Sequence, residues 1–423
     1  MKTKSLLTIL VLLLGIALLV PSLSASAASD NKLVVYHWWT AGGEKEAIDA
    51  VFDLYKTVYP NLEIAENPVS GGGGGIMRSK IKTMIMAGNA PDTFQITYGS
   101  GMLESWVSVL QPIDEIWADI PVPDKIKEMG TIDGHQYGIP LNIMRNNCLW
   151  YNKELVEELG IDMPLENWDD LFAACEKAKE AGYIPYAVGA GSGQEFWLAS
   201  QIFQTFVLSS PHGGPEYLEK LYNGEANPSE DKAVREALGA IKHMLDEGYI
   251  NSDYAALTWD KAADLLVADK AVFYQMGDWV KGHFNAVGWK SGVDFNYQSS
   301  PGTEGVFSLH LDCFVFPQGA PHPTTAKKWL HLLRTAEAET VFCPLKGATP
   351  PRLDAFTDMY DVISQDILKD FRDPDTTIVE SAFAGPPEAW LDVFGRMFSN
   401  FFEKPNVDQG VKDFARAYRS ISW

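Results

Sequence analysis

Strand-like and helix-like segments alternate along the chain, and this order constrains the fold more than any other feature of the sequence. Residues 33–37 form a short apolar run typical of a buried strand. Residues 44–59 then carry apolar side chains at the spacing of a helix, which Pro60 ends. The alternation continues with a strand pattern at residues 62–66, a helix pattern at 77–87 and a strand pattern at 92–97. Such an alternation predicts an α/β fold with doubly wound sheets.

A second α/β set begins beyond residue 141. Helical patterns cover residues 168–181, 194–207, 231–247 and 255–268, and strand patterns cover residues 186–189, 271–276 and 307–316. The length of 423 residues suggests about two or three domains of ordinary size, and two lobes is the simplest arrangement. The sequence therefore predicts two lobes, with more than one crossing of the chain between them. We expect the helical segment at residues 407–418 to pack on the second lobe.

The amino-terminal 27 residues have the parts of an export signal. Lys2 and Lys4 give a positive start, residues 6–20 are an apolar run, and Ala25-Ser26-Ala27 is a small-residue cleavage site. The apolar run is shorter than the about 20 residues that a membrane-spanning helix needs. Since no cysteine stands at the cut site, nothing indicates a lipoprotein. We expect cleavage after Ala27 and release into a periplasm or outside the cell.

Charge and cysteine usage narrow the classes of partner. The net charge is −22, which disfavours nucleic acid and anionic membranes, because both are bound by clustered Lys and Arg. The cysteines are too far apart for the usual metal-ligand spacing, and no metal or other cofactor is predicted. In an oxidising compartment, the four cysteines can form one or two disulfides. Buried apolar thiols explain Cys148 and Cys175 equally well, and the remaining two are Cys313 and Cys343.

Several short motifs, in a fixed order along the chain, carry a family resemblance. They are Trp38-Trp39, a glycine-rich turn at 71–75, and the segments 90–95, 138–140, 149–153, 270–273 and 276–279. With this set the mature chain resembles the family 1 extracellular solute-binding proteins, which are the sugar-capturing subunits of bacterial carbohydrate ABC importers. Trp38-Trp39, the segment 344–347 and the strand of Asp312 resemble the glucose-binding branch of that family.

The resemblance implies a two-lobed periplasmic-binding-protein fold that closes over a sugar by hinge motion and delivers it to the membrane permease. It implies a monomer without catalytic activity. By pattern we place the hinge crossings near Leu141, Pro301 and Leu345. Lobe 1 is then residues 28–141 plus 302–345, and lobe 2 is residues 142–301 plus 346–423. Clefts between domains are common ligand sites, which suits this arrangement.

Tryptophans are the first candidates for contact with a sugar, because the aliphatic face of a pyranose packs on an indole ring. Trp38 and Trp39 stand where the first strand ends. Adjacent strand residues point to opposite faces, so at least one of the two is expected to face the cleft. Trp279 follows the strand at 271–276 in the same way and is expected to form a second platform from the other lobe.

Polar candidates would bond the sugar hydroxyls. Glu44 opens the first helix, where favourable interaction with the helix dipole also explains it. Gln95 and Thr97 end the third strand, Asp312 interrupts an apolar strand, and Lys346 follows an expected crossing. A buried charge needs a partner, so Asp312 and Lys346 can form an ion pair. A sugar hydroxyl can also bridge the two side chains, and the two arrangements are compatible. Weaker candidates are Asn142, Arg145, Trp197 and Asp278.

The chain departs from the glucose-binding branch at two positions. Where that branch tends to have histidines, this sequence has Thr97 followed by Tyr98, and Ala384 near the end. With two hydrogen-bonding groups absent, a different hexose, or a disaccharide that fills the vacated volume, stays open beside a glucose-like hexose.

Two other function classes remain as alternatives. A secreted glycoside hydrolase also uses tryptophan platforms with two cleft carboxylates, for which Glu44 and Asp312 are the candidate pair. A binding protein for a polyol or a peptide is the other. The glycine run at 71–75 lacks the Gly-Lys-Ser/Thr ending of a P-loop, so we expect a flexible loop near the cleft there. His135, His212 and His322 are expected to face solvent.

Overall fold

The computed structural model describes residues 31–191 and 196–423. The expected export signal with its cleavage site after Ala27 lies outside these residues. Among the described helices, none combines the length and apolar character needed to cross a membrane.

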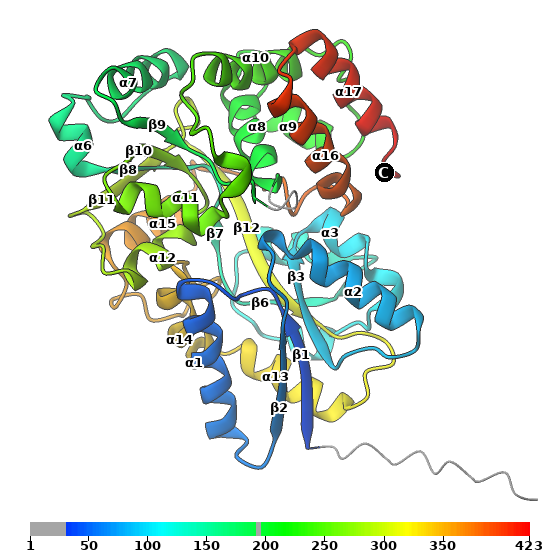
Figure 1. The fold of residues 1–423 in the computed structure, drawn as a ribbon. Coiled ribbons are helices and arrows are strands. Elements are labelled where there is room, and N and C mark those ends of the chain that lie inside the picture. The colour runs from blue at the N-terminus through cyan, green and yellow to red at the C-terminus, as the bar shows by residue number, and fades with distance from the viewer. Residues whose placement is uncertain (1–30, 192–195) are drawn as a thin grey trace, which may run out of the picture.

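The first sheet forms the core of the lower lobe in Figure 1. Its strands are β1 (Lys32–His37), β2 (Glu63–Pro68), β3 (Thr93–Tyr98), β6 (Gly138–Pro140), β7 (Met144–Arg145), β12 (Val306–Val315) and β13 (Thr377–Glu380). The main path runs in the order β13-β12-β3-β1-β2, with β6 and β7 also paired to β12. β1 is parallel to β2 and β3, whereas β12 is antiparallel to β3. The sheet is therefore mixed, with the parallel core expected of an α/β lobe.

The second sheet forms the core of the upper lobe. Its strands are β8 (Cys148–Asn152), β9 (Ile184–Ala187), β10 (Ala271–Gln275) and β11 (Phe295–Ser299), in the order β11-β8-β10-β9. Only β9 and β10 are parallel, and β8 runs antiparallel to both of its neighbours. The expected strand at 186–189 begins slightly earlier, at Ile184.

Helices cover both sheets. Those near the first sheet are α1 (Gly43–Val58), α2 (Gly75–Met86), α3 (Ser100–Glu104), α4 (Asp114–Trp117), α5 (Asp124–Met129), α13 (Pro323–Leu333) and α14 (Ala336–Lys346). The others are α6 (Lys153–Glu158), α7 (Trp168–Glu180), α8 (Trp197–Ser209), α9 (Pro215–Tyr222), α10 (Lys232–Asp246), α11 (Trp259–Val267), α12 (Val280–Ala286), α15 (Val362–Arg372), α16 (Ala389–Glu403) and α17 (Val407–Arg419). α17 packs against α10 and α16, so the expectation that the last helix joins the second lobe is confirmed.

The strands of the chain pass from the first sheet to the second and later return to the first. The chain leaves the first sheet between Arg145 and Cys148, slightly past the expected Leu141, and returns between Ser299 and Val306. The expected boundaries assign all residues after 345 to lobe 2, but β13 pairs with β12 and lies in the first sheet. The backbone pairing of a four-residue strand depends on a distant partner, which its own sequence does not reveal.

The four cysteine thiols are buried, and so is His322. Cys148, Cys175, Cys313 and Cys343 are all free, so the disulfides left open by the sequence do not form. His322 was expected to face solvent, but it is buried and its Nδ1 lies 2.8 Å from Asp92 Oδ2. The carboxylate of Asp92 also accepts a hydrogen bond from the backbone amide of His322, which connects the start of α13 to the start of β3.

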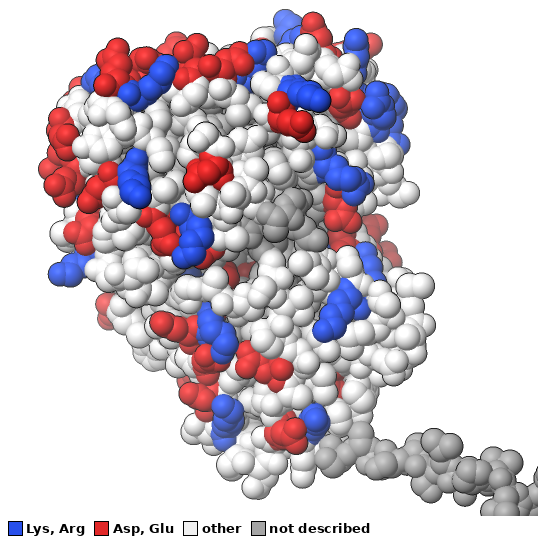
Figure 2. Space-filling view, viewed as in Figure 1, with Lys and Arg blue, Asp and Glu red and all other residues white. Residues whose placement is uncertain are grey.

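Acidic side chains gather at the top of the molecule, around α7 and α10 (Figure 2).

Candidate functional site

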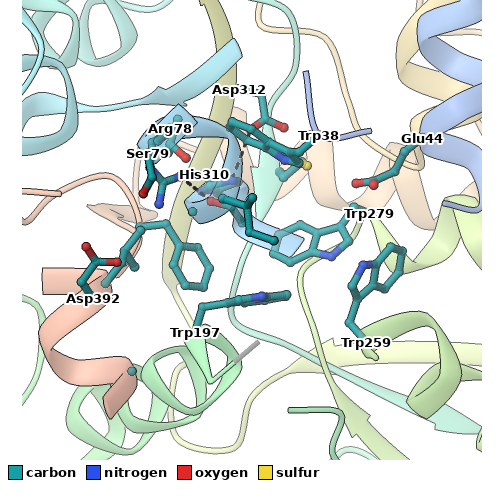
Figure 3. Close-up of a pocket in the computed structure, with 18 of the residues that line it drawn as sticks. Trp38, Glu44, Arg78, Ser79, Trp197, Trp259, Trp279, His310, Asp312 and Asp392 are labelled. Carbon is teal, nitrogen blue, oxygen red and sulfur yellow. Dashed lines mark hydrogen bonds and ion pairs between the residues drawn. The ribbon is translucent and has the colours of Figure 1, made fainter. Parts of the chain in front are cut away.

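A cavity of about 420 Å³ lies between the two lobes, within the size range of small-molecule sites. Strand ends and helix starts from both lobes line it. The expected site residues found in its wall are Trp38, Glu44, Thr97, Trp197, Trp279, Asp312 and Lys346. The glycine run also reaches it through Gly73 and Gly75, as expected of a loop near the cleft. Figure 3 shows the labelled side chains converging on one space.

Trp38 is positioned by the glycine turn that precedes α2. A side chain on Gly74 would place its Cβ 2.3 Å from the Trp38 ring, and the φ of Gly74 is +72°. Only glycine combines this left-handed conformation with such a close approach. On the strand side, the Trp38 backbone amide donates to Gln95 Oε1 at 3.1 Å. The turn and β3 together therefore fix the indole against the cavity.

Aromatic rings from the second lobe form the opposite wall. Trp197 is the first residue of α8, and its ring centroid lies 6.2 Å from that of Trp279 and 5.4 Å from that of Phe383. Trp259, the first residue of α11, lines the same side. The indole Nε1 of Trp197 is buried without a hydrogen-bond partner among the described residues. A buried donor of this kind normally has a hydrogen-bond partner, and Trp197 itself lines the cavity.

Lys346 forms a buried ion pair with Glu44 rather than with Asp312. The close approach depends on Gly43, because a Cβ there would lie 2.2 Å from the carbonyl oxygen of Leu345. Burial raises the pKa of Glu44, and the ammonium group of Lys346 opposes that shift. The Lys346 ammonium also lies 5.7 Å from the Trp279 ring centroid, within cation–π range.

Asp312 is held from two sides on β12. Its backbone amide donates to Asn142 Oδ1 at 2.8 Å, and its Oδ1 lies 3.7 Å from His310 Nε2. Burial acts to raise the pKa of Asp312, but His310, Lys346 and Asn142 together hold it below its usual value. Asp312 Oδ1 is buried and has no hydrogen-bond partner among the described residues. An ionised carboxylate oxygen of this kind can accept a bond from a ligand hydroxyl.

Trp39 and Gln95 do not line the cavity. Trp39 is completely buried, with its ring centroid 4.7 Å from Phe342 and 5.8 Å from Phe314. The alternation along β1 sends Trp38 to the cleft and Trp39 into the core. Gln95 is buried behind Trp38 and bonds its backbone, so it positions the tryptophan from behind the wall.

The weaker candidates also include residues that line the cavity and residues that do not. Only Trp197 lines the cavity, whereas Asn142 supports Asp312 from behind. Arg145 points elsewhere: it bonds Asp370 at 2.6 Å and Ser299 at 2.8 Å, at the crossing between the sheets. Asp278 is fully buried beside Trp279, and burial raises its pKa to about 7.

Sequence reasoning missed several residues in the wall. Those with polar side chains are Arg78, Ser79, His310, Asp392 and Arg396, and those without are Ile76, Met144, Trp259, Phe383, Leu391 and Gly395. His310 had a usable signal, because it stands two residues before Asp312 on a strand and therefore shares its face. The α16 residues had none, since a polar helix face next to a cleft has the same pattern as one in solvent.

The wall suits binding of a neutral polar molecule with apolar faces. Indole rings provide stacking surfaces, while carboxylates and an indole N–H provide hydrogen bonds. Among the described residues, no group of three or more His, Cys, Asp or Glu side chains is placed to hold a metal ion.

Comparisons with known proteins agree on the type of molecule. The sequence profile described as bacterial extracellular solute-binding protein matches residues 41–340. An ABC transporter extracellular-binding protein of Pyrococcus horikoshii is 38% identical over 396 residues, which cover 92% of this chain and 88% of that protein. A probable sugar-binding periplasmic protein of Mesorhizobium japonicum is 29% identical over 370 residues, covering 85% and 86%. A solved chitin oligosaccharide binding protein shares the fold, with a TM-score of 0.80 at 16% identity over 92% of this chain and 98% of that one.

Proposed function

Since the chain belongs to the bacterial extracellular solute-binding proteins, we propose that it is the sugar-binding subunit of an ABC importer. It captures a mono- or disaccharide between its lobes and delivers it to the membrane permease. The name of the Mesorhizobium relative supports sugar as the class of solute. The export signal in the first 27 residues supports release outside the cytoplasm, with cleavage after Ala27.

The proposal rests on one observation: Trp197 and Asp312 line a cavity walled by indole rings, and Trp197 Nε1 and Asp312 Oδ1 are buried without a hydrogen-bond partner among the described residues. Asp312 Oδ1 would accept a sugar hydroxyl, and Trp197 Nε1 would donate to one. Trp38 and Trp279 come from different lobes and offer stacking surfaces to a ring between them. A sugar satisfies both polar groups and covers the indoles at once.

We expect the two lobes to close on the ligand, because the groups that would contact it come from both lobes. Asp312 and Trp38 belong to the first lobe, and Trp197 and Trp279 to the second. A ligand that contacts both lobes binds the closed form more tightly than the open form, and so shifts the population towards closure. The chain then acts as a monomeric clamp without chemistry of its own.

A glycoside hydrolase is the second candidate, because burial raises the pKa of Glu44 while that of Asp312 is lowered. Such a pair resembles an acid and a base of separated pKa values. The ion pair with Lys346 counts against it, since it engages the Glu44 carboxylate that would have to donate a proton.

Thermal unfolding of the mature chain, residues 28–423, tests the proposal against a panel of glucose, galactose, mannose, xylose, common disaccharides, polyols and peptides. A ligand at about 100 times its Kd stabilises the folded state by about 2.7 kcal/mol. Stabilisation by a sugar that chromatography recovers intact supports the proposal. Cleavage of the sugar would show the hydrolase instead, and stabilisation by polyols or peptides alone would show another class of solute.

A further inference from the structure

A second cavity, of about 300 Å³, is lined by both lobes and shares no lining residue with the candidate sugar site. Its wall includes residues of α3 and α5 from the first lobe, residues of α9 from the second lobe, and the end of β13. Figure 1 shows α3 in the lower lobe and α9 in the upper one. The segment that follows β13 lies between the two cavities, because Phe383 lines the sugar cavity whereas Glu380 and Gly385 line the second one.

The carboxylate of Glu380 lines this second cavity without a cationic partner. Its Oε1 accepts a hydrogen bond from Ser100 Oγ at 2.9 Å, and its Oε2 accepts one from the Ser100 backbone amide at 2.9 Å. It forms no ion pair with any described residue. Burial raises the pKa of Glu380, and the bonds from Ser100 and the charge of Lys125 oppose this shift without cancelling it. A carboxylate in such surroundings is stabilised by a positive charge placed beside it.

Tyr222 on α9 adds a second polar group that the protein leaves unused. Its side chain lines the cavity and is only 5% exposed, yet its hydroxyl has no hydrogen-bond partner among the described residues. A Cβ on Gly385 would lie 2.7 Å from Tyr222 Cδ2 and 3.1 Å from Glu380 Cβ, so both side chains pack against this glycine. Since buried hydroxyls normally have a partner, the free hydroxyl beside a free carboxylate indicates a ligand.

The rest of the wall is acidic and partly apolar. Glu128 on α5 and Glu219 on α9 are exposed, and neither pairs with a described residue. Lys125 is the one basic side chain among the described residues of the wall. Met129 and Leu218 are almost completely buried and add apolar surface. No three described His, Cys, Asp or Glu side chains are placed to hold a metal ion, so this acidic wall suits an organic cation.

From these contacts we propose that the second cavity binds a small organic cation with a primary ammonium group and a short apolar chain. An ammonium group has three N–H donors, and Glu380 and Tyr222 can accept two of them. Hydrogen bonds between a cation and a carboxylate are stronger than neutral ones. The apolar chain would cover Met129 and Leu218, which favours an alkylamine over the ammonium ion itself. This site is separate from the proposed sugar site, and neither depends on the other.

Calorimetric titration of the mature chain with n-pentylamine tests the site at pH 7.5, where the amine is protonated. The wild type should bind it with a Kd of about 1 mM or tighter, and should bind the neutral n-pentanol at least about tenfold more weakly. Glu380→Gln should weaken amine binding by at least about tenfold, and Tyr222→Phe by about threefold. Glu216→Gln removes an exposed carboxylate of α9 that does not line the cavity, so this matched control should bind the amine normally.

A further variant keeps the test decisive if Glu380→Gln fails to fold. Lys125→Gln removes the positive charge that acts on Glu380 and should tighten amine binding by about threefold. The site is overturned if the amine does not bind at millimolar concentration, if n-pentanol binds as tightly, or if Lys125→Gln weakens the binding. Equal losses in Glu216→Gln and Glu380→Gln would show general attraction to the acidic surface instead. Loss of amine binding in Asp312→Asn alone would place the amine in the sugar cavity and overturn the second site.

Discussion

Lys346, at the end of α14, forms a buried ion pair with Glu44, at the start of α1, across 302 residues of sequence. Both side chains line the cavity, so the pair is part of the candidate site and of the packing between α1 and α14. Removing one partner of such a pair is costly, because the other charge stays buried.

Lys346→Met should therefore destabilise the protein by about 3 to 5 kcal/mol at pH 8. The loss should be smaller at pH 5, because Glu44, whose pKa is already raised by burial, can then take up a proton. Urea unfolding of the variant and the wild type at both pH values measures this loss of unfolding free energy. Adding Glu44→Gln removes the unpaired charge and should restore most of the stability, and a double variant no more stable than Lys346→Met would contradict this account.

Trp38 and Trp39 should respond in opposite ways to truncation. Trp39→Ala empties a core site between Phe314 and Phe342 and should cost about 3 to 5 kcal/mol of unfolding free energy. Trp38→Ala should instead remove sugar binding, because its ring faces the cavity. Chemical unfolding and calorimetry on both variants check the division. Loss of sugar binding by a Trp39→Phe variant of normal stability would show that Trp39 contacts the ligand.

Asp312→Asn should weaken sugar binding by about 10- to 100-fold, because a charge-assisted hydrogen bond becomes a neutral one. Asparagine has nearly the same shape, so the fold should persist. Asp53→Asn, on the exposed face of α1, serves as the control and should bind normally. Equal affinity of the two variants would remove Asp312 from the site.

Asp278 should make stability depend on pH. It is completely buried, neither carboxylate oxygen has a hydrogen-bond partner among the described residues, and burial raises its pKa to about 7 from 3.8. The charged and titratable groups that act on it or that it acts on are Arg145, Cys148, Lys281, Cys343 and Lys346.

Between these two pKa values the folded protein holds a proton that the unfolded chain has lost, so this group lowers stability as pH rises, by about 1.4 kcal/mol per unit. Asp278→Asn replaces the titratable carboxyl group with a neutral amide. The stability of the variant relative to the wild type should therefore grow from pH 5 to pH 7 and level off above that. Parallel stability curves for the two proteins would contradict a raised pKa.

The sequence by itself determined the fold class and most of the elements. Local periodicity set α1, α10 and β12 almost to the residue, because burial of one face shows directly in the spacing of apolar side chains. It also found Asp312, since a charge inside an apolar strand is conspicuous wherever the strand lies.

Only the tertiary structure decided which candidates share one cavity. Strand alternation separates Trp38 from Trp39 but does not tell which of them faces the core. The partner of Lys346 and the neighbours of Arg145 depend on contacts between segments hundreds of residues apart, as do the wall residues of α16. Such contacts leave no local periodicity, because each side chain's neighbours are set by how whole helices and strands pack.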